Sequence, residues 1–207
     1  MPLVEMDLFV ESTAVPRDVR LFLREAERRI ERSQMQGRFP GFVPSDFATS
    51  FRVLRALTAT AVVPGTLFCE WGSGFGVVAC LAAMLDYDAY GIEIEEDLVS
   101  AAQELAADFD LPVEFIRGSF IPRGAEADVG RGEPFAWLNT DESSTEEQLG
   151  LAVDDFGVIF AYPWPDEERL TADLFEHYAN VGAVLVTYHG GEDYLLRRKT
   201  TARPARK

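Results

Sequence analysis

The sequence has 207 residues, of which 47% are hydrophobic and 12% aromatic, which is enough for one hydrophobic core. This length and composition exclude global disorder and a second catalytic domain. The 19 basic and 35 acidic residues give a formal net charge of −16, which disfavours duplex nucleic acid as a partner because phosphate binding needs a basic surface.

The N-terminus and the cysteines indicate the compartment. Glu5, Asp7 and Glu11 lie where a secretion signal has basic residues, and no apolar run reaches the roughly 18 residues of a membrane span. Cys69 and Cys80 both lie inside apolar runs, so a disulfide framework is not predicted. We therefore expect a soluble, cytoplasmic protein with no membrane partner.

Residues 1–44 are predicted to form a leader and an amphipathic helix. Between residues 18 and 36, apolar side chains recur at helical spacing on one face, at Val19, Phe22, Leu23, Ala26 and Ile30. Residues 37–44 interrupt this pattern, and Ser45 or Asp46 can then cap a second helix. The apolar stripe of that helix consists of Phe47, Phe51, Leu54 and Leu57.

From Thr66 onward, short apolar runs alternate with helical patterns. Near-continuous apolar runs are typical of strands covered on both faces, and the helices between them supply right-handed crossovers. The runs are Thr66–Glu70, Ala89–Glu93, Val113–Ile116, Phe156–Ala161 and Ala183–Tyr188, and the helical patterns are Val77–Leu85, Asp97–Phe109 and Asp166–Asn180. The sequence therefore predicts an α/β fold with a doubly wound, mostly parallel sheet, formed by residues 45–199.

Two segments of this region lie outside the regular alternation. The connection Pro122–Ala152 is long and rich in Gly, Glu, Ser and Thr, which is typical either of a functional lid or of a mobile loop. After Tyr188 only one further strand fits, at Tyr194–Arg198, so the C-terminal strand region is expected to be short.

The most informative motif is Glu70-Trp71-Gly72-Ser73-Gly74-Phe75-Gly76, directly after the first run and before the first helical pattern. In an open α/β sheet, ligands bind outside the carboxyl ends of the strands, and glycines there let a ligand approach the backbone. A dinucleotide fingerprint needs glycine at Val77, and a phosphate-binding Walker loop needs Gly-Lys-Ser/Thr. Neither pattern is present, so a different cofactor is indicated.

An acid at the strand end followed by Gly-x-Gly-x-Gly resembles motif I of the class I S-adenosylmethionine-dependent methyltransferases, which have a seven-strand, Rossmann-like fold. The resemblance covers about Phe42 to Lys199 and implies S-adenosyl-L-methionine as the cofactor. It also implies that Glu70 anchors the amino-acid end of the cofactor. The cofactor would lie against the loop residues Gly72, Ser73, Gly74 and Gly76.

Two further positions agree with this resemblance. The second strand ends at Glu93, 17 residues beyond Gly76, where a carboxylate can accept hydrogen bonds from both ribose hydroxyls and repels a 2′-phosphate. Ser119 and Phe120 lie where the family contacts the adenine. We therefore expect both positions to belong to the cofactor site.

The fourth strand leads into Tyr162-Pro163-Trp164, where the family has its acceptor-side motif IV. Ala161 replaces the Asp or Asn with which nucleic-acid amino-methyltransferases bind the target amine, so nucleic acid is not the expected acceptor. Tyr162, Pro163 and Trp164 are the candidate catalytic residues, because rigid aromatic walls can attract and orient a cationic amine.

Together with Phe42-Val43-Pro44-Ser45, this pattern is most similar to small seven-strand protein lysine methyltransferases. The predicted function is methyl transfer to a nucleophile, with a protein lysine nitrogen as the expected acceptor. The alternatives are a small-molecule methyltransferase and a non-catalytic S-adenosylmethionine-binding sensor or interaction protein, with a nicotinamide oxidoreductase the more distant alternative.

The remaining candidates are few. His189, just after the fifth strand, can either take a proton from the acceptor or cap a turn. No His, Cys and acid cluster at ligand spacing occurs in the sequence, so no metal site is predicted.

The charge is unevenly distributed along the chain. Residues 197–207 hold six basic residues and no acid, and residues 200–207 are predicted to form a basic tail. Residues 1–196 hold 13 basic and 35 acidic residues, a net charge of −22. Such an acidic body suits a cationic substrate or cofactor, and it equally serves solubility.

Overall fold

A computed structural model describes residues 1–122, 125 and 145–201. Its centre is a seven-stranded sheet with the strand order β1-β7-β6-β5-β2-β3-β4. The strands are β1 (Leu3–Glu5), β2 (Leu67–Trp71), β3 (Asp88–Glu93), β4 (Val113–Arg117), β5 (Val158–Ala161), β6 (Val184–Tyr188) and β7 (Tyr194–Lys199). The helices are α1 (Arg17–Met35), α2 (Phe47–Ala59), α3 (Val77–Ala83), α4 (Glu96–Asp108), α6 (Thr145–Leu149) and α7 (Glu168–Tyr178), with a 3₁₀ turn η1 (Val153–Asp155).

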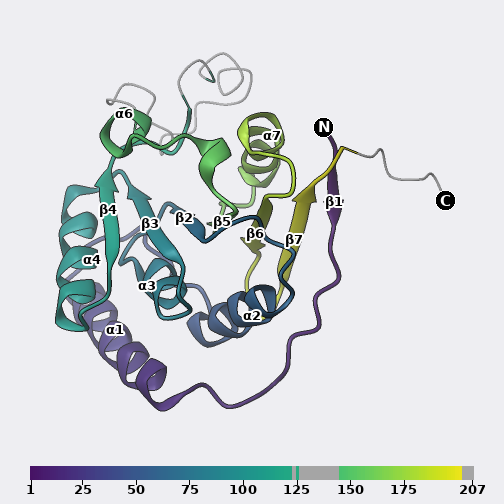
Figure 1. Ribbon diagram of the computed structural model, residues 1–207. Helices are drawn as coiled ribbons and strands as arrows, with labels where there is room; N and C mark the ends of the chain where they lie inside the picture. Colours follow the sequence, from purple (N-terminus) through teal and green to yellow (C-terminus); the bar gives the residue numbers. More distant parts are fainter. Residues whose placement is uncertain (123–124, 126–144, 202–207) are drawn as a thin grey trace.

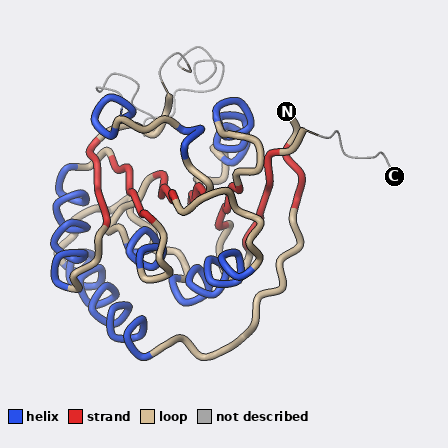
Figure 2. The backbone as a smooth tube through the Cα atoms, in the orientation of Figure 1, coloured by secondary structure: helices blue, strands red, loops and turns tan. Residues whose placement is uncertain are grey.

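The sheet is mostly parallel, as the apolar runs predicted. β4, β3, β2, β5 and β6 pair in parallel, β7 is antiparallel to β6, and β1 is antiparallel to β7. Helices α1 to α4 cover one face, and α6, η1 and α7 cover the other (Figure 1; Figure 2). The predicted α/β fold with a doubly wound sheet is therefore confirmed.

Burial on both faces explains why the strands have continuous apolar runs. In β5, Val158 and Phe160 belong to the core under α1 to α4, whereas Ile159 and Ala161 belong to the core under α7. All four side chains are buried. A strand whose alternate side chains enter two different cores cannot show the polar alternation of a half-exposed strand.

The ends of several elements differ slightly from the prediction. β2 extends to Trp71, β5 begins at Val158 rather than Phe156, and α7 spans a shorter segment than the pattern at 166–180. The predicted cap of α2 is confirmed at Asp46, whose side chain accepts a hydrogen bond from the Thr49 N–H at 3.0 Å. The segment Pro122–Ala152, predicted as a lid or a mobile loop, lies largely outside the described residues.

The N-terminal leader contains a strand that the sequence did not predict. Leu3–Glu5 form β1 at the edge of the sheet, where Leu3 is paired with Lys199. The Met6 N–H donates to the Leu196 carbonyl at 2.9 Å, and the Thr200 N–H donates to the Pro2 carbonyl at 3.1 Å. A strand of three residues is too short to carry a recognisable period, so only its partner β7 defines it.

Three of the basic residues assigned to the C-terminal segment belong to the sheet. Arg197, Arg198 and Lys199 lie in β7, and the Lys199 side chain is buried. Its Nζ donates hydrogen bonds to the carbonyls of His177, at 3.2 Å, and of Ala179. Lys199 therefore binds the C-terminal end of α7 to β7, and burial lowers its pKa.

We expect Lys199→Met to lower the free energy of unfolding by about 2–3 kcal/mol, because it leaves two carbonyls without their charged donor. Arg169, whose side chain is 93% exposed, provides the control variant Arg169→Met, which should change stability by less than about 0.5 kcal/mol. Urea unfolding of both variants measures the difference. Equal stabilities would show that solvent satisfies the α7 carbonyls equally well.

Among the described helices, none combines the length and apolar character that are required to cross a bilayer.

Candidate functional site

The glycine loop, residues 72–76, joins the carboxyl end of β2 to the start of α3. The Ser73 N–H donates to the Ile92 carbonyl at 2.9 Å, which fixes the loop to the end of β3. Gly76 precedes α3 with φ +67°, and a Cβ built there lies 2.3 Å from the ring of Phe115. A side chain at position 76 would separate α3 from β4, so this glycine permits close packing.

A cavity opens beside the loop and joins cofactor-side and acceptor-side residues of the prediction. Glu70, Gly72, Ser73 and Tyr162 all line it. The other lining residues are Phe42, Val43, Ser45, Phe47, Phe75, Val77 and Phe160. The structure therefore brings residues from the ends of β2 and β5 to one site, as the parallel register of these two strands requires.

Two loop residues leave groups available to a ligand. No atom lies within 4 Å of a Cβ built at Gly72, which has φ +69°. The hydroxyl of Ser73 is buried and has no hydrogen-bond partner. Buried polar groups without partners are rare, so the open backbone and the Ser73 hydroxyl together indicate a place where a polar ligand approaches the loop.

Glu70 places a buried carboxyl group at this cavity. One of its oxygens, Oε2, accepts a hydrogen bond from the Ala79 N–H at 2.8 Å. Burial raises the pKa of Glu70 well above its usual range, the Ala79 hydrogen bond opposes this shift, and the charge of Glu93 adds to it. A buried acid of this kind is stabilised as a carboxylate by a cationic ligand group.

Glu93 lies at the end of β3, as predicted, but its carboxylate contacts the backbone. Oε2 accepts from the Gly74 N–H at 2.8 Å, and Oε1 accepts from the N–H groups of Ile94, at 2.7 Å, and Glu95, at 3.0 Å. The side chain is 8% exposed. Glu93 therefore holds the glycine loop against β3, a structural role that sequence reasoning, which assigned it to ribose hydroxyls, did not predict.

Phe42 is a site residue that the site prediction missed. Its ring lies against the glycine loop, 2.3 Å from a Cβ built at Gly74, and packs edge-on against Phe75 with the ring centroids 5.0 Å apart. Phe39 makes a similar contact with Phe75 at 5.9 Å. The available signal was the pair of aromatic residues in the interruption at 37–44, a segment in which solvent-facing residues are usually polar.

Ser119 and Phe120 have different surroundings. The Gly118 N–H donates to the Glu93 carbonyl at 2.9 Å. This hydrogen bond places the neighbouring residue, Ser119, beside the end of β3. The Ser119 hydroxyl accepts from the Ile121 N–H at 3.2 Å. The ring of Phe120 instead stacks on Trp71, with centroids 5.0 Å apart and an interplanar angle of 10°.

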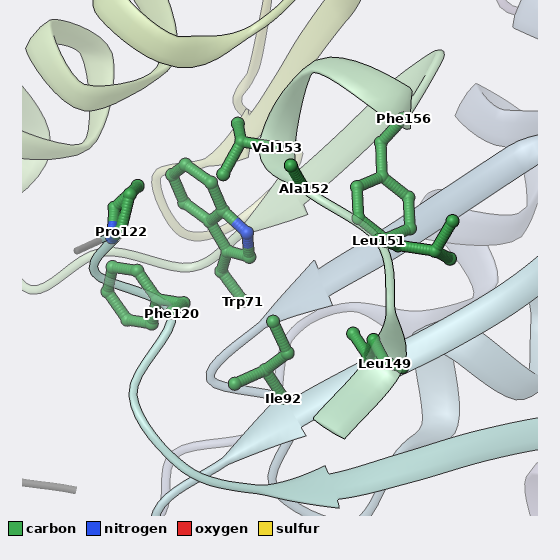
Figure 3. Close-up of a pocket in the computed structure, with 9 residues that line it drawn as sticks. All are labelled: Trp71, Ile92, Phe120, Pro122, Leu149, Leu151, Ala152, Val153 and Phe156. Carbon is green, nitrogen blue, oxygen red and sulfur yellow. The ribbon is translucent and has the colours of Figure 1, made fainter. Parts of the chain in front are cut away.

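Phe120 thus lines a second, apolar cavity on the α7 side of the sheet (Figure 3). This cavity is lined by Trp71, Ile92, Phe120, Pro122, Leu149, Leu151, Ala152, Val153 and Phe156. None of these residues lines the cavity beside the glycine loop. The ring of Phe120 therefore faces Trp71 and this second cavity, and its place in the cofactor site stays a prediction.

The candidate catalytic residues follow β5. Tyr162 is 37% exposed and packs edge-on against Tyr188, whose ring centroid is 4.6 Å away. Trp164 is 45% exposed, whereas Pro163 is buried. Of these three residues only Tyr162 lines the cavity beside the glycine loop.

His189 has hydrogen-bond partners for both ring nitrogens. Nδ1 lies 3.0 Å from Glu168 Oε1, and Nε2 lies 2.8 Å from the Thr187 hydroxyl. Since a carboxylate only accepts, Nδ1 carries a proton, and the Thr187 hydroxyl, which also lies 3.4 Å from the Leu195 carbonyl, is the partner of Nε2. These two bonds join the start of α7 to the end of β6, and since both partners are side chains, the alternatives of proton transfer and turn capping stay predictions. Within the described part of the chain, no group of three or more His, Cys, Asp and Glu residues is placed to bind a metal ion.

Comparisons with known proteins identify the fold. No protein-family model matches the chain, and no curated protein matches it in sequence. The structure is similar to an RNA methyltransferase from Salinibacter ruber in complex with S-adenosyl-L-homocysteine, with a TM-score of 0.53 and 18% identity over 78% of this chain and 97% of that chain.

The structure is also similar to the structures of two O-methyltransferases. TomG from Streptomyces achromogenes, in complex with S-adenosylmethionine, has a TM-score of 0.51 and 16% identity over 85% of this chain and 66% of that chain. An enzyme from Bacillus cereus, in complex with S-adenosylhomocysteine, has a TM-score of 0.53 and 13% identity over 85% of this chain and 67% of that chain. At these identities the similarity establishes the fold, which is the seven-strand, Rossmann-like fold of methyltransferases.

Proposed function

We propose that the protein is an S-adenosylmethionine-dependent methyltransferase whose acceptor is a protein lysine nitrogen. The observation that carries the proposal is the cavity beside the glycine loop, which joins the buried carboxyl of Glu70 to the acceptor-side residue Tyr162. The fold established by the comparisons is consistent with this function, although one fold can support several functions.

The residues around the cavity suit S-adenosylmethionine. Glu70 would hold the ammonium group of its amino-acid end, and the backbone at Gly72 and the Ser73 hydroxyl would lie against it. Glu93 would act through the loop that it holds, with a ribose contact as a further part of the proposal. When bound, this cofactor supplies a methyl group already activated on a sulfonium.

The protein side chains then have to orient the acceptor and exclude water. Tyr162 forms an aromatic wall of the cavity, and Phe42 and Phe47 line it on the side of α2. These apolar walls limit the access of water to the reacting groups. Orienting the acceptor and excluding water need no acid–base residue. The ring nitrogens of His189 already have Glu168 and Thr187 as partners.

Three features favour a lysine nitrogen as the acceptor. The formal net charge of −16 attracts basic protein segments. Ala161 supplies no polar contact for a nucleobase amine. Tyr162 and Trp164 expose large aromatic surfaces at the carboxyl end of β5, where a cationic alkyl amine is attracted to aromatic faces.

Cofactor selectivity and methyl transfer test the proposed function. S-adenosylmethionine and S-adenosylhomocysteine should raise the melting temperature, whereas NAD and NADP should not. Methyl-labelled cofactor added to a host lysate should transfer label to protein lysines, at a rate that increases from about pH 7 to 9 because a larger fraction of the amine is neutral.

Each alternative gives a different result in this experiment. Label in a small metabolite or in nucleic acid, with none in protein, would exclude the lysine acceptor and retain the methyltransferase. Cofactor binding without any turnover to S-adenosylhomocysteine would favour a sensor or interaction protein. Stabilisation by NAD alone would contradict the proposal entirely.

A further inference from the structure

Tyr194, the first residue of β7, connects two walls of the cavity beside the glycine loop, although it does not line the cavity itself. Phe160 and Tyr162, at the end of β5, form the first wall. The second wall leads into α2 and consists of Phe42, Val43, Ser45 and Phe47. Since the second wall belongs to a helix and not to the sheet, side-chain contacts have to fix its distance from β5.

The ring of Tyr194 packs on the side of β5. Its centroid lies 6.5 Å from that of Phe160 and 4.9 Å from that of Tyr188, which is its cross-strand partner in β6. Tyr188 in turn packs edge-on against Tyr162, with the centroids 4.6 Å apart. The ring of Tyr194 is therefore connected to both residues of the first wall, to one directly and to the other through Tyr188.

The hydroxyl of Tyr194 reaches the second wall. It lies 2.7 Å from Ser50 Oγ and 3.0 Å from the carbonyl oxygen of Asp46, both within hydrogen-bond distance. Asp46 is the N-cap of α2 and stands between Ser45 and Phe47, which line the cavity. Ser50, one turn further along α2, is fully buried. These contacts hold the first turn of α2, and with it the second wall, to β7.

The hydroxyl is the part of Tyr194 that packing alone does not explain. A phenylalanine at this position could make the same ring contacts with Phe160 and Tyr188. Burial raises the pKa of Tyr194, so the hydroxyl stays protonated and able to donate at neutral pH. Because a buried hydroxyl costs free energy unless it is hydrogen-bonded, its partners on α2 fix where that helix lies.

The cavity between the two walls contains the residues that are proposed to hold the amino-acid end of the cofactor. Glu70 and Ser73 both line it. Neither Glu93 nor Ser119, the residues predicted to contact the nucleoside, belongs to its lining. A cavity whose walls are already in place binds its ligand with less loss of conformational freedom. The distance between the walls should therefore affect the amino-acid end of the cofactor and not the nucleoside.

We propose that Tyr194 is a positioning residue of the cofactor site, which holds the second wall at the distance from β5 that fits the amino-acid end of S-adenosylmethionine. This inference rests on the proposed function. Tyr194 acts through Ser45 and Phe47, which its hydroxyl fixes by way of Asp46 and Ser50. It sets the affinity for the amino-acid end and leaves the affinity for the nucleoside unchanged.

The experiment compares two ligands that share the nucleoside. S-adenosylhomocysteine has the amino-acid end, and 5′-methylthioadenosine lacks it. Both are titrated calorimetrically into the wild type and into Tyr194→Phe. The variant should bind S-adenosylhomocysteine about three- to tenfold more weakly, because the wall spends less time in the binding position once its hydrogen bonds are lost. Its affinity for 5′-methylthioadenosine should equal that of the wild type.

Tyr87→Phe is the matched control, because it removes a hydroxyl contact to the other end of the same helix. The Tyr87 hydroxyl lies 3.1 Å from Thr58 Oγ1, near the C-terminal end of α2. Tyr87 directly precedes β3, at the edge of the sheet opposite to the glycine loop. The control should leave both affinities unchanged. Equal weakening of S-adenosylhomocysteine binding by Tyr87→Phe and Tyr194→Phe would show a general loosening of α2 and would overturn the proposal.

Ser50→Ala provides a second variant. It keeps the Tyr194 hydroxyl and removes one of its two partners, so it should weaken S-adenosylhomocysteine binding by a smaller factor and spare 5′-methylthioadenosine. Wild-type affinity for S-adenosylhomocysteine in folded Tyr194→Phe contradicts the proposal, as does equal weakening of the two ligands. If Tyr194→Phe does not fold, wild-type affinity in Ser50→Ala contradicts it instead.

Failure of this inference can be distinguished from failure of the proposed function. A wild type that binds no S-adenosylhomocysteine excludes the proposed function and the role of Tyr194 with it. If Tyr194→Phe shows the selective weakening but the wild type transfers no methyl group, the methyltransferase fails and the role of Tyr194 stands. If the wild type transfers methyl groups and Tyr194→Phe keeps the wild-type KM for S-adenosylmethionine, only the role of Tyr194 fails.

Discussion

Replacing Glu93 by alanine should lower the free energy of unfolding by about 2–4 kcal/mol and abolish cofactor binding. The carboxylate accepts hydrogen bonds from the N–H groups of Gly74, Ile94 and Glu95, and alanine leaves all three without this partner. The Gly74 N–H is buried, so water cannot readily replace the lost acceptor there. Without that bond the glycine loop is no longer held against β3.

Urea unfolding and calorimetric titration with S-adenosylhomocysteine measure the two effects. Glu95→Ala is the matched control, because Glu95 is in the same turn, is exposed and makes no side-chain capping bond to α4. It should alter neither stability nor affinity by more than about 0.5 kcal/mol. If Glu93→Ala binds the cofactor with wild-type affinity, Glu93 does not organise the loop for binding.

Replacing Glu70 by glutamine should lower the affinity for S-adenosylmethionine by about 10- to 100-fold without destabilising the protein. Glutamine keeps an oxygen that can accept from the Ala79 N–H and fits the same space, but it has no charge for the ammonium group of the cofactor. The two acids at neighbouring strand ends should therefore differ. Glu93→Ala should lower both the stability of the protein and its affinity for the cofactor, whereas Glu70→Gln should lower the affinity alone.

The stability of the Glu70→Gln variant should also depend on pH in a defined direction. The pKa of Glu70 is raised in the folded protein, so the folded state binds this proton more tightly than the unfolded state. The stability that Glu70 contributes is present at low pH and is lost as the pH rises through its folded pKa. Glutamine has no such loss, so the variant should gain stability relative to wild type as the pH increases above about 4.5.

Urea unfolding of the wild type and of Glu70→Gln at several pH values between about 4.5 and 8 measures this difference in stability. Glu114→Gln, an exposed position in β4, serves as the control and should show no comparable difference. A Glu70→Gln variant that is less stable than wild type at neutral pH, or that binds the cofactor normally, would contradict the assignment of Glu70.

The sequence determined the elements whose signal is local. The apolar runs predicted β2 to β6, and those of β2, β5 and β6 are nearly continuous because a strand buried on both faces needs apolar residues at almost every position. The glycines at 72, 74 and 76 and the acids at 70 and 93 could be placed at adjacent strand ends, because parallel strands end at one edge of the sheet. From these two rules the position of the candidate site could be predicted without any tertiary contact.

Only the tertiary structure decided which atoms these residues contact. Phe42 reaches Gly74 and Lys199 reaches Ala179, and neither pair has a sequence spacing that a helical or strand period could reveal. The ring of Phe120 stacks on Trp71, and this contact joins the end of β2 to the segment after β4, two segments that only the folded chain brings together.

The same reason explains the two acids whose surroundings the sequence did not predict. A carboxylate is attracted to donors in any direction, so residue type alone cannot show whether Glu93 faces a ligand or the backbone of its own loop. Glu167 reads in sequence as an ordinary acid at the start of a helix, where the helix dipole favours negative charge. Its burial and its unpaired oxygen arise from the packing of the 162–164 loop against α7, which depends on contacts that no local pattern encodes.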